Sequence, residues 1–325
     1  MTSKISRKNF LKKSFFGASA LSVSPLALSA AFPKKELATL INLNKCIGCE
    51  ACVYACQESN EHKFPKPKKP FPQMYPKRVK VADWSDKTKI TNRLTPYNWL
   101  TIQTVSVQIK GEEKEINIPR RCMHCQDPPC VILCPWGAAR KNDKGISRID
   151  SELCLGGAKC KAVCPWEIPE RQTGVGLYLD LLPSLAGNGV MYKCDRCYDK
   201  IEKGERPACI EACPQGVQEI GPREEIIKKA HALAKETKGY LYGETENGGT
   251  NTIYLSPVPF SELEKNRPKG KGRPHFKQTK NALEQGDNLA KIMFIAPFAG
   301  IVAAFGRFYG FFKKNSLIQE NQNEK

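Results

Sequence analysis

The sequence predicts an α+β fold in which two small units of strand, cysteine-rich loop and short helix are nested in one chain. Fifteen cysteines fall into four compact motifs, and strand-like and helix-like segments flank these motifs. The two middle motifs lie close together in the chain, whereas a long segment separates the first motif from the last. The middle motifs are therefore expected to form one unit, and the outer two a second unit around it.

The expected elements follow one another in the order that such units require. In the last helix, Ile226, Ala230 and Leu233 share one apolar stripe, and Gly239 stands just past the end. The elements are a strand over 38–43, a helix over 51–58, a hairpin formed by 98–108 and 114–118, a strand over 145–150 and an amphipathic helix over 222–236.

The cysteine spacing is typical of loops that wrap an iron–sulfur cluster. Two residues separate the first positions of each motif, so a short loop brings several thiolates to one cluster, and a cysteine further on reaches a neighbouring cluster. In the third motif, Gly157 stands where the second cysteine is expected. The motifs are Cys46-x2-Cys49-x2-Cys52-x3-Cys56, Cys122-x2-Cys125-x4-Cys130-x3-Cys134-Pro135, Cys154-x2-Gly157-x2-Cys160-x3-Cys164-Pro165 and Cys194-x2-Cys197-x11-Cys209-x3-Cys213-Pro214.

Two other uses of cysteine compete with this interpretation. Paired cysteines form structural zinc sites, and exported proteins use cysteines in disulfides. Zinc ligation would need pairs of CxxC, whereas most of these motifs carry a third and a fourth cysteine at ferredoxin spacing, and disulfides would leave one of the fifteen cysteines over. Iron–sulfur ligation is therefore favoured, and the chain without its clusters is expected to be poorly folded, because ligation supplies part of the folding free energy.

The N-terminal residues 1–31 are expected to be an export signal. Arg7-Lys8 precedes an apolar stretch over 15–32, and Ser29-Ala30-Ala31 offers a cleavage site. This arrangement resembles a twin-arginine signal in which Lys8 replaces the second arginine. An ordinary secretory signal or a membrane anchor is the alternative.

A transmembrane helix is expected within residues 289–314. The segment 292–312 is long enough to span the hydrocarbon layer if Arg307 reaches the surface. Lys313-Lys314 and the tail 315–325 would then be cytoplasmic, which agrees with an exported domain at the other end. A buried or interfacial helix is the alternative.

A basic, Pro-rich insert over 63–93 contributes to the formal net charge of +18. Basic tracts also occur in nucleic-acid-binding proteins, but export argues against nucleic acid as a partner. A solvated loop, a partner contact and a face for anionic lipid headgroups remain open. No catalytic or dinucleotide-binding motif is found, so the chain is not expected to be an enzyme by itself.

The cysteine frame from Cys46 to Cys213 resembles the iron–sulfur subunits of membrane-bound oxidoreductases. That class includes the molybdopterin enzymes that act on nitrate, dimethyl sulfoxide, polysulfide and formate, and the [NiFe] hydrogenases. Within the class, the chain resembles the exported hydrogenase-2 type through the segments 241–244, 248–250 and 257–259. The resemblance implies two nested ferredoxin-like units over 32–240, a C-terminal extension over 241–288 and a single transmembrane helix.

The resemblance also implies how the cysteines share clusters. Three [4Fe–4S] clusters and one [3Fe–4S] cluster are expected, the latter because Gly157 offers no thiolate. The implied ligand sets are Cys46, Cys49, Cys52 and Cys213; Cys56, Cys194, Cys197 and Cys209; Cys122, Cys125, Cys130 and Cys164; and Cys134, Cys154 and Cys160 for the [3Fe–4S] cluster.

The implied function is electron relay at the periplasmic face of the bacterial inner membrane. The partners would be a periplasmic catalytic subunit, facing the clusters of the outer motifs, and a quinone-linked membrane subunit, nearer the Gly157 cluster. A stand-alone membrane-tethered polyferredoxin that serves several redox partners is the alternative. Genes for a catalytic and a multi-helix subunit beside this gene would favour the first interpretation.

Five residues near the cysteines carry weaker expectations. His124 is either a ligand or, more in keeping with a loop residue, directed toward solvent or a partner. Lys193 and Arg196 flank Cys194 and either raise the potential of a cluster or are solvated. Trp136 and Trp166 are expected to pack over the cluster loops.

Overall fold

The computed structural model of the chain describes residues 36–185 and 188–284. All of them belong to one structural unit, 35–325. The expected signal at 1–31, the expected transmembrane helix at 289–314 and the tail lie outside the described residues. Within the described ranges, no helix combines the length and apolar character that a membrane span needs.

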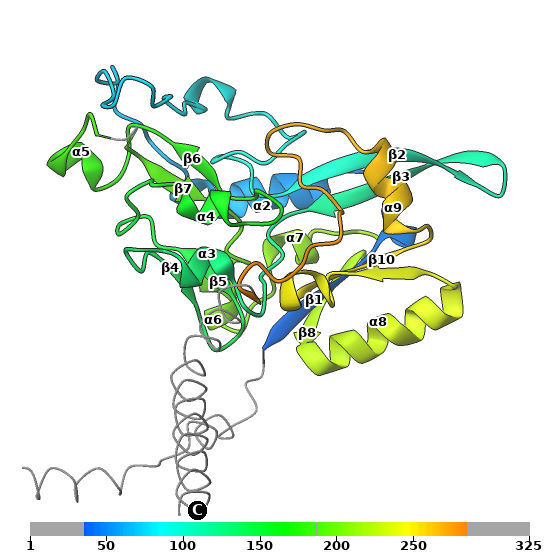
Figure 1. Ribbon diagram of the computed structural model, residues 1–325. Coiled ribbons are helices and arrows are strands. Elements are labelled where there is room, and N and C mark those ends of the chain that lie inside the picture. Colours follow the sequence, from blue (N-terminus) through cyan, green and yellow to red (C-terminus); the bar gives the residue numbers. More distant parts are fainter. Residues whose placement is uncertain (1–35, 186–187, 285–325) are drawn as a thin grey trace, which may run out of the picture. The chain divides into compact units, whose positions relative to one another are not determined.

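A four-stranded sheet with one helix against it forms a core without cysteines. Strand β1 pairs in parallel with β10 and antiparallel with β8, and β9 pairs antiparallel with β10. In their order across the sheet, the strands are β8 (Gln218–Pro222), β1 (Leu37–Asn42), β10 (Thr252–Ser256) and β9 (Tyr240–Tyr242), with α8 (Arg223–Thr237) alongside. Figure 1 shows α8 running beside this sheet, where Ile226 and Ala230 pack with Leu40 and Ile253.

The hairpin that the sequence predicts is present and leads directly into the second cysteine motif. It consists of β2 (Thr101–Ile109) and β3 (Glu112–Arg120), which pair antiparallel over their whole length. Val105 and Ile118 are buried on one face, as the alternating pattern requires. Figure 1 shows the hairpin extending away from the other strands.

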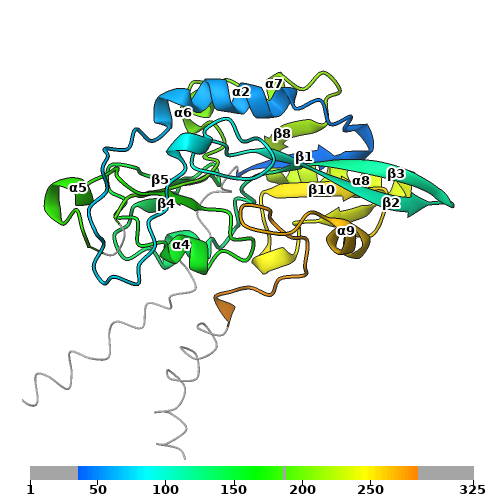
Figure 2. The ribbon, with the colours of Figure 1, turned by 90° about the horizontal axis from the view of Figure 1, so that it is seen from above.

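Four helices hold the third cysteine position of each motif, and the fourth cysteine follows four residues later. In α2 both cysteines lie in the helix, one turn apart, whereas in the other three motifs the fourth cysteine lies two residues past the helix end. The helices are α2 (Ala51–Asn60), α3 (Pro129–Ile132), α4 (Lys159–Ala162) and α7 (Ala208–Glu211). Helix α2 packs against α7, and α3 packs against α4. Figure 2 shows α2 and α7 side by side. The first motif therefore meets the fourth, and the second meets the third.

Short strands and helices complete the described chain. Strand β4 pairs antiparallel with β5, and β6 pairs antiparallel with β7. The bounds are β4 (Ala139–Lys141), β5 (Ser147–Ile149), β6 (Glu170–Gln172), β7 (Val190–Tyr192), α5 (Tyr178–Leu181), α6 (Tyr198–Glu202) and α9 (Phe260–Asn266). The 3-10 turns are η1 (Leu43–Lys45), η2 (Glu61–Lys63), η3 (Ser85–Lys87) and η4 (Glu246–Gly248).

The structure confirms the predicted strand at 38–43 as β1 and the predicted helices at 51–58 and 222–236 as α2 and α8. The predicted strand at 145–150 is the shorter β5. The sequence pattern did not predict β8, β9 and β10. They are short, and their pairing depends on β1, which lies far away in the sequence.

Candidate iron–sulfur cluster sites

All four cysteine loops bend through a left-handed residue at the same place. The residue just before the second cysteine position has a positive φ in each loop, and in two loops it is the non-glycine residue His124 (48°) or Arg196 (58°). Such backbone costs free energy and persists only where the surrounding structure holds it. The third loop keeps the same bend at Gly156, so the loss of a cysteine at Gly157 has not changed the loop conformation.

The folded chain brings cysteines of different motifs together in four sets. The thiol of Cys46 interacts electrostatically with Cys213, the thiol of Cys56 with Cys194, Cys197 and Cys209, and the thiol of Cys164 with Cys122 and Cys130. The thiol of Cys154 interacts with Cys134. We number these sets site 1 (Cys46, Cys49, Cys52, Cys213), site 2 (Cys56, Cys194, Cys197, Cys209), site 3 (Cys122, Cys125, Cys130, Cys164) and site 4 (Cys134, Cys154, Cys160).

Neighbouring sites adjoin within each pair of motifs. Cys52 of site 1 interacts with Cys209 of site 2, and Cys160 of site 4 interacts with Cys130 of site 3. Because the helices α2 and α7 pack together, as do α3 and α4, one thiol of each helix reaches the adjoining site. The sites therefore form two adjoining pairs.

Three of the sites line cavities of their own. The cavities at sites 1 and 3 each have a volume of about 20 Å³, and each is lined by all four cysteines of its set. The cavity at site 4 has a volume of about 100 Å³ and is lined by its three cysteines and by Gly157. Thiolates that converge on a small cavity from loop and helix are the donor set of an iron–sulfur cluster, so these residues fit the cofactor.

Burial sets the protonation of the free thiols. Burial, reinforced by neighbouring cysteines, raises the pKa of Cys52 and of Cys160 to about 12. In Cys56 the same causes raise the pKa well above its ordinary value. Such thiols are neutral at pH 7 without iron, so ligation must release protons.

Backbone N–H groups donate hydrogen bonds to at least one cysteine sulfur in every site. Such bonds stabilise negative charge on the sulfur and help to set the potential of a cluster. The donors are Val217 to Cys213 (3.4 Å), Arg196 to Cys194 (3.3 Å), His124 to Cys122 (3.5 Å), Met191 to Cys154 (3.4 Å) and Ala139 to Cys134 (3.5 Å). In site 2, Asn60 adds a side-chain contact, with Nδ2 at 3.8 Å from Cys56 Sγ.

The described residues contain no group of three His, Cys, Asp or Glu side chains close enough to hold a single metal ion. In a cluster each thiolate binds a different iron, so the sulfurs need not converge on one point.

Lys193 and Arg196 are buried, which removes the solvated alternative for both. Lys193 is 5% exposed and Arg196 is fully buried. Arg196 Nη1 donates to the Leu37 carbonyl (2.6 Å) and Nη2 to the Asn251 carbonyl (2.7 Å), so this side chain ties the fourth motif to β1 and to the start of β10.

His124 does not point toward solvent. Its ring is fully buried, and Nδ1 accepts a hydrogen bond from the Ser147 N–H (3.2 Å). Burial, together with the nearby positive charges of Arg196 and Lys193, lowers the pKa of His124 well below its ordinary value, so the ring is neutral. The expectation of a solvent-directed or partner-directed side chain is wrong because the loop turns this residue into the interior.

The two tryptophans that follow Cys-Pro differ. Trp166 is buried beside site 3, where Nε1 donates to the Tyr242 hydroxyl (2.8 Å). Trp136 borders the cavity of site 4 but is 62% exposed. Both therefore lie at a cluster loop as expected, but only Trp166 is covered by other parts of the chain.

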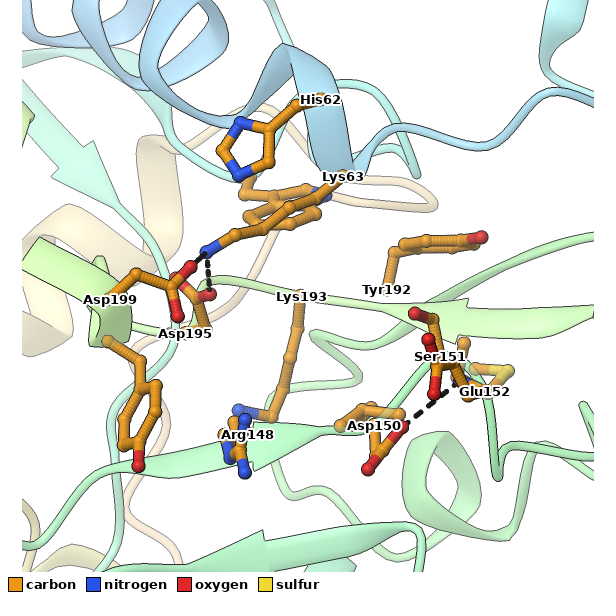
Figure 3. A pocket seen from close by; sticks show the side chains of 14 residues that line it. His62, Lys63, Arg148, Asp150, Ser151, Glu152, Tyr192, Lys193, Asp195 and Asp199 are labelled. Atoms are coloured by element: carbon orange, nitrogen blue, oxygen red, sulfur yellow. Dashed lines mark hydrogen bonds and ion pairs between the residues drawn. The ribbon is translucent and has the colours of Figure 1, made fainter.

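A polar cavity of about 460 Å³ lies beside the fourth motif (Figure 3). Lys63, at the start of the basic insert, points toward Asp195 and Asp199 and forms ion pairs with them at 2.7 and 2.6 Å. Arg148 stacks on the Tyr198 ring at 4.3 Å from its centre. The contacts attach the insert to the loop that carries Cys194 and Cys197.

Sequence reasoning missed Arg121, a second fully buried arginine near the cysteines. It is fully buried, and its guanidinium approaches the Cys194 thiol and interacts with Cys209. A signal was available, because a basic residue stands immediately before the first cysteine in three motifs, as Lys45, Arg121 and Lys193. Lys45 is exposed, so only the fold shows which of the three faces a cluster site.

The family models that match this chain cover the same four cysteine motifs. Residues 45–138 and 114–223 each match a 4Fe-4S dicluster domain family. The chain is 29% identical to the hydrogenase-2 operon protein HybA of Escherichia coli O157:H7, over 80% of this chain and 83% of that protein. It is 30% identical to the iron–sulfur subunit of nitrate-inducible formate dehydrogenase of Escherichia coli K12, over 83% of this chain and 84% of the relative. One subunit of the anaerobic dimethyl sulfoxide reductase of the same organism is 28% identical over 60% of this chain and 77% of that subunit.

Proposed function

Because this chain belongs to the family of iron–sulfur electron-transfer subunits of oxidoreductases, we propose that it relays single electrons between a periplasmic catalytic subunit and a quinone-linked membrane subunit. The clusters would supply one-electron exchange. The chain would fix the positions of the clusters, form their surroundings and control how closely redox partners approach them. The catalytic partner would be a hydrogenase or a molybdopterin enzyme, in line with the relatives that carry hydrogenase, formate dehydrogenase and dimethyl sulfoxide reductase names.

The adjoining cysteine sites are the observation that carries the proposal. Cys52 and Cys56 lie one turn apart on α2 and contribute to sites 1 and 2, and Cys130 and Cys134 do the same for sites 3 and 4. A helix that offers ligands to two sites fixes the separation between them. The packing of α2 on α7 and of α3 on α4 supports two nested units that each hold two clusters.

Site 4 is proposed to hold a [3Fe–4S] cluster and the other sites [4Fe–4S] clusters. Gly157 has no side chain, and its position is exposed, so no described thiolate replaces the missing ligand in the set of Cys134, Cys154 and Cys160. The ligand sets are those of sites 1 to 4. A [3Fe–4S] cluster usually has a higher potential than a cubane in similar surroundings, which suits exchange with a quinone.

Replacing Cys160 with Ser in the intact complex tests whether site 4 connects the chain to the quinone-linked subunit. We expect quinone-linked turnover to stop, while an artificial dye still exchanges electrons with the catalytic subunit. The matched control is Cys49→Ser in site 1, which should interrupt the relay at the opposite end. Quinone-linked turnover that survives with the site 4 cluster demonstrably absent would show that electrons leave by another route.

A periplasmic location with a C-terminal membrane anchor is part of the proposal. It is based on Arg7-Lys8 and on the apolar segment 292–312. Carbonate-washed membranes should retain the whole chain, and truncation before Leu289 should release it into the periplasm. Retention of the truncated chain in washed membranes would contradict the anchor.

A further inference from the structure

Three buried positive charges lie between the two pairs of cluster sites. Arg121 and Arg196 are fully buried, and Lys193 is 5% exposed. Among residues 36–185 and 188–284, no carboxylate lies within ion-pair distance of any of the three. Buried charge without a directly paired counter-charge is unfavourable. Asp195 acts on Lys193 without an ion pair, and the remaining negative partners of Arg121 and Lys193 are cysteines of the cluster sites and, for Arg121, Tyr254.

Arg121 faces site 2. It leaves the end of β3 directly before Cys122, yet its guanidinium approaches Cys194 and interacts with Cys209 of the fourth motif. No oxygen or nitrogen of the described chain accepts a hydrogen bond from its three nitrogens. Burial opposes the charge, but negative charge on Cys209 and Cys194, the form these sulfurs take as cluster ligands, raises the pKa of Arg121 above its ordinary value. The guanidinium therefore has unpaired donors for an anionic group at site 2.

Lys193 faces site 3. Its Nζ donates to the backbone carbonyls of Ser147 and Cys194, which fixes the ammonium in place. Burial opposes the charge, but negative charge on Cys122 and Cys130, the form these sulfurs take as cluster ligands, raises the pKa of Lys193, and the more distant Asp195 adds to this. Lys193 therefore directly precedes the fourth motif in the sequence, but its side chain lies beside cysteines of the second motif.

Arg196 has a different role from the other two. Its two Nη atoms donate to the Leu37 and Asn251 carbonyls and to Thr252 Oγ1. Burial, together with the charge of Arg121, lowers the pKa of Arg196 to about 9. Its positive charge adds to the field between the sites, but its contacts hold strands rather than cysteines.

We propose that Arg121 and Lys193 are the counter-charges of the two inner clusters, Arg121 for site 2 and Lys193 for site 3, and that they raise the potentials of these clusters at the junction between the two ferredoxin-like units. This inference rests on the proposed relay. A cluster that accepts one electron from the preceding redox centre gains one negative charge. A fixed cation beside it therefore favours the reduced form.

The test is a redox titration of the holoprotein in its complex, followed by EPR, with Arg121→Gln and Lys193→Gln. We expect each variant to lower one potential, and the double variant to lower two. The ratio of reduced to oxidised cluster at a given potential should fall about tenfold, which corresponds to ~59 mV for one electron. Arg121→Lys, which keeps the charge, should recover most of the wild-type potential.

Arg120 provides a matched control. It is also fully buried and adjacent in sequence, but its guanidinium lies 3.8 Å from the centre of the Phe276 ring and donates to the His275 carbonyl (2.8 Å). Arg120→Gln should lower the thermal stability and leave all potentials unchanged.

The outcomes separate this inference from the relay itself. If Arg121→Gln and Lys193→Gln retain their iron and every potential stays at its wild-type value, the counter-charge role is wrong while the relay stands. If Arg121→Gln loses iron, the proposal is tested by the titration of Lys193→Gln alone. Cluster potentials that are unchanged in Lys193→Gln would then contradict the proposal. If wild-type protein shows no EPR-detectable clusters, the relay is wrong.

Discussion

Sites 2 and 4 use the same type of loop and helix in opposite surroundings. The four cysteines of site 2 are between 4% and 6% exposed, and Arg121 closes the site from the hairpin side. Site 4 has three cysteines, an exposed glycine at the fourth position and a cavity of about 100 Å³ bordered by the exposed Trp136.

The difference separates two tasks within one fold. Site 2 is enclosed by α2, the fourth motif and Arg121, and Cys56, Cys194 and Cys209 are part of the main hydrophobic core. Cys154 and Cys160 of site 4 belong to the same core, at 7% and 8% exposed, but the cavity of this site is bordered by the exposed Gly157 and Trp136 and therefore reaches the surface. Burial protects a cluster and ties it to stability, whereas exposure allows exchange with a partner.

The largest difference is expected when one ligand is removed from each site. Cys209→Ser should lower the free energy of unfolding by ~3 kcal/mol or more, because it removes a core cysteine and leaves Arg121 without its counter-charge. Cys134→Ser should remove the site 4 cluster with a smaller loss of stability. Anaerobic thermal melting and iron content measure both effects.

Equal losses of stability in the two variants would contradict the comparison. Cys49→Ser is a useful third variant, since Cys49 is a proposed ligand of site 1, which adjoins the buried site 2, but is itself exposed. Its melting temperature should fall between those of the other two.

A cysteine at position 157 should convert site 4 into a complete site. No atom lies within 4 Å of a Cβ placed on Gly157, and its φ is not in the left-handed region, so the thiol has room. The iron content should rise from about 15 to about 16 per chain, and the EPR signal of an oxidised [3Fe–4S] cluster should disappear. Gly156→Ala is the control, because its Cβ would collide with the Gly189 carbonyl oxygen and disturb the loop without adding a ligand.

Wild-type protein that already holds sixteen irons and lacks this signal would mean that a ligand from elsewhere completes site 4. The Gly157→Cys substitution would then leave both measurements unchanged.

The smallest effect is expected at the ion pairs that fasten the insert beside site 2. Lys63→Met removes the bridge to Asp195 and Asp199 and should cost ~1 kcal/mol. Burial opposes the charge of Lys63, but Asp195 raises its pKa above 10.5, so the contribution is present at neutral pH and is lost only above that value. Lys69→Met, at an exposed ion pair of the insert, should leave the melting temperature unchanged. Thermal melting at pH 7 and at pH 8 measures the effect, and the difference between Lys63→Met and wild-type protein should be the same at both pH values. Equal melting temperatures for Lys63→Met and Lys69→Met would contradict the prediction.

The sequence alone determined the cysteine frame and the elements that carry it. The spacing of the cysteines is local chemistry, because a loop of a few residues must bring several thiolates to one cluster. For the same reason the hairpin, α2 and α8 were predictable from periodicity within single segments. The missing ligand at Gly157 was also visible in the sequence, since the frame around it is intact.

Only the tertiary structure decided how charges are arranged around that frame. Arg121 and Lys193 look alike in the sequence, each directly before a cysteine, yet each faces cysteines of another motif because the loops cross between the two units. Arg120 and Arg121 are neighbours that point to different surroundings, and His124 turns inward on a left-handed residue. Burial and neighbouring charge are properties of residues far apart in the chain, so they depend on packing and cannot be determined from local sequence patterns.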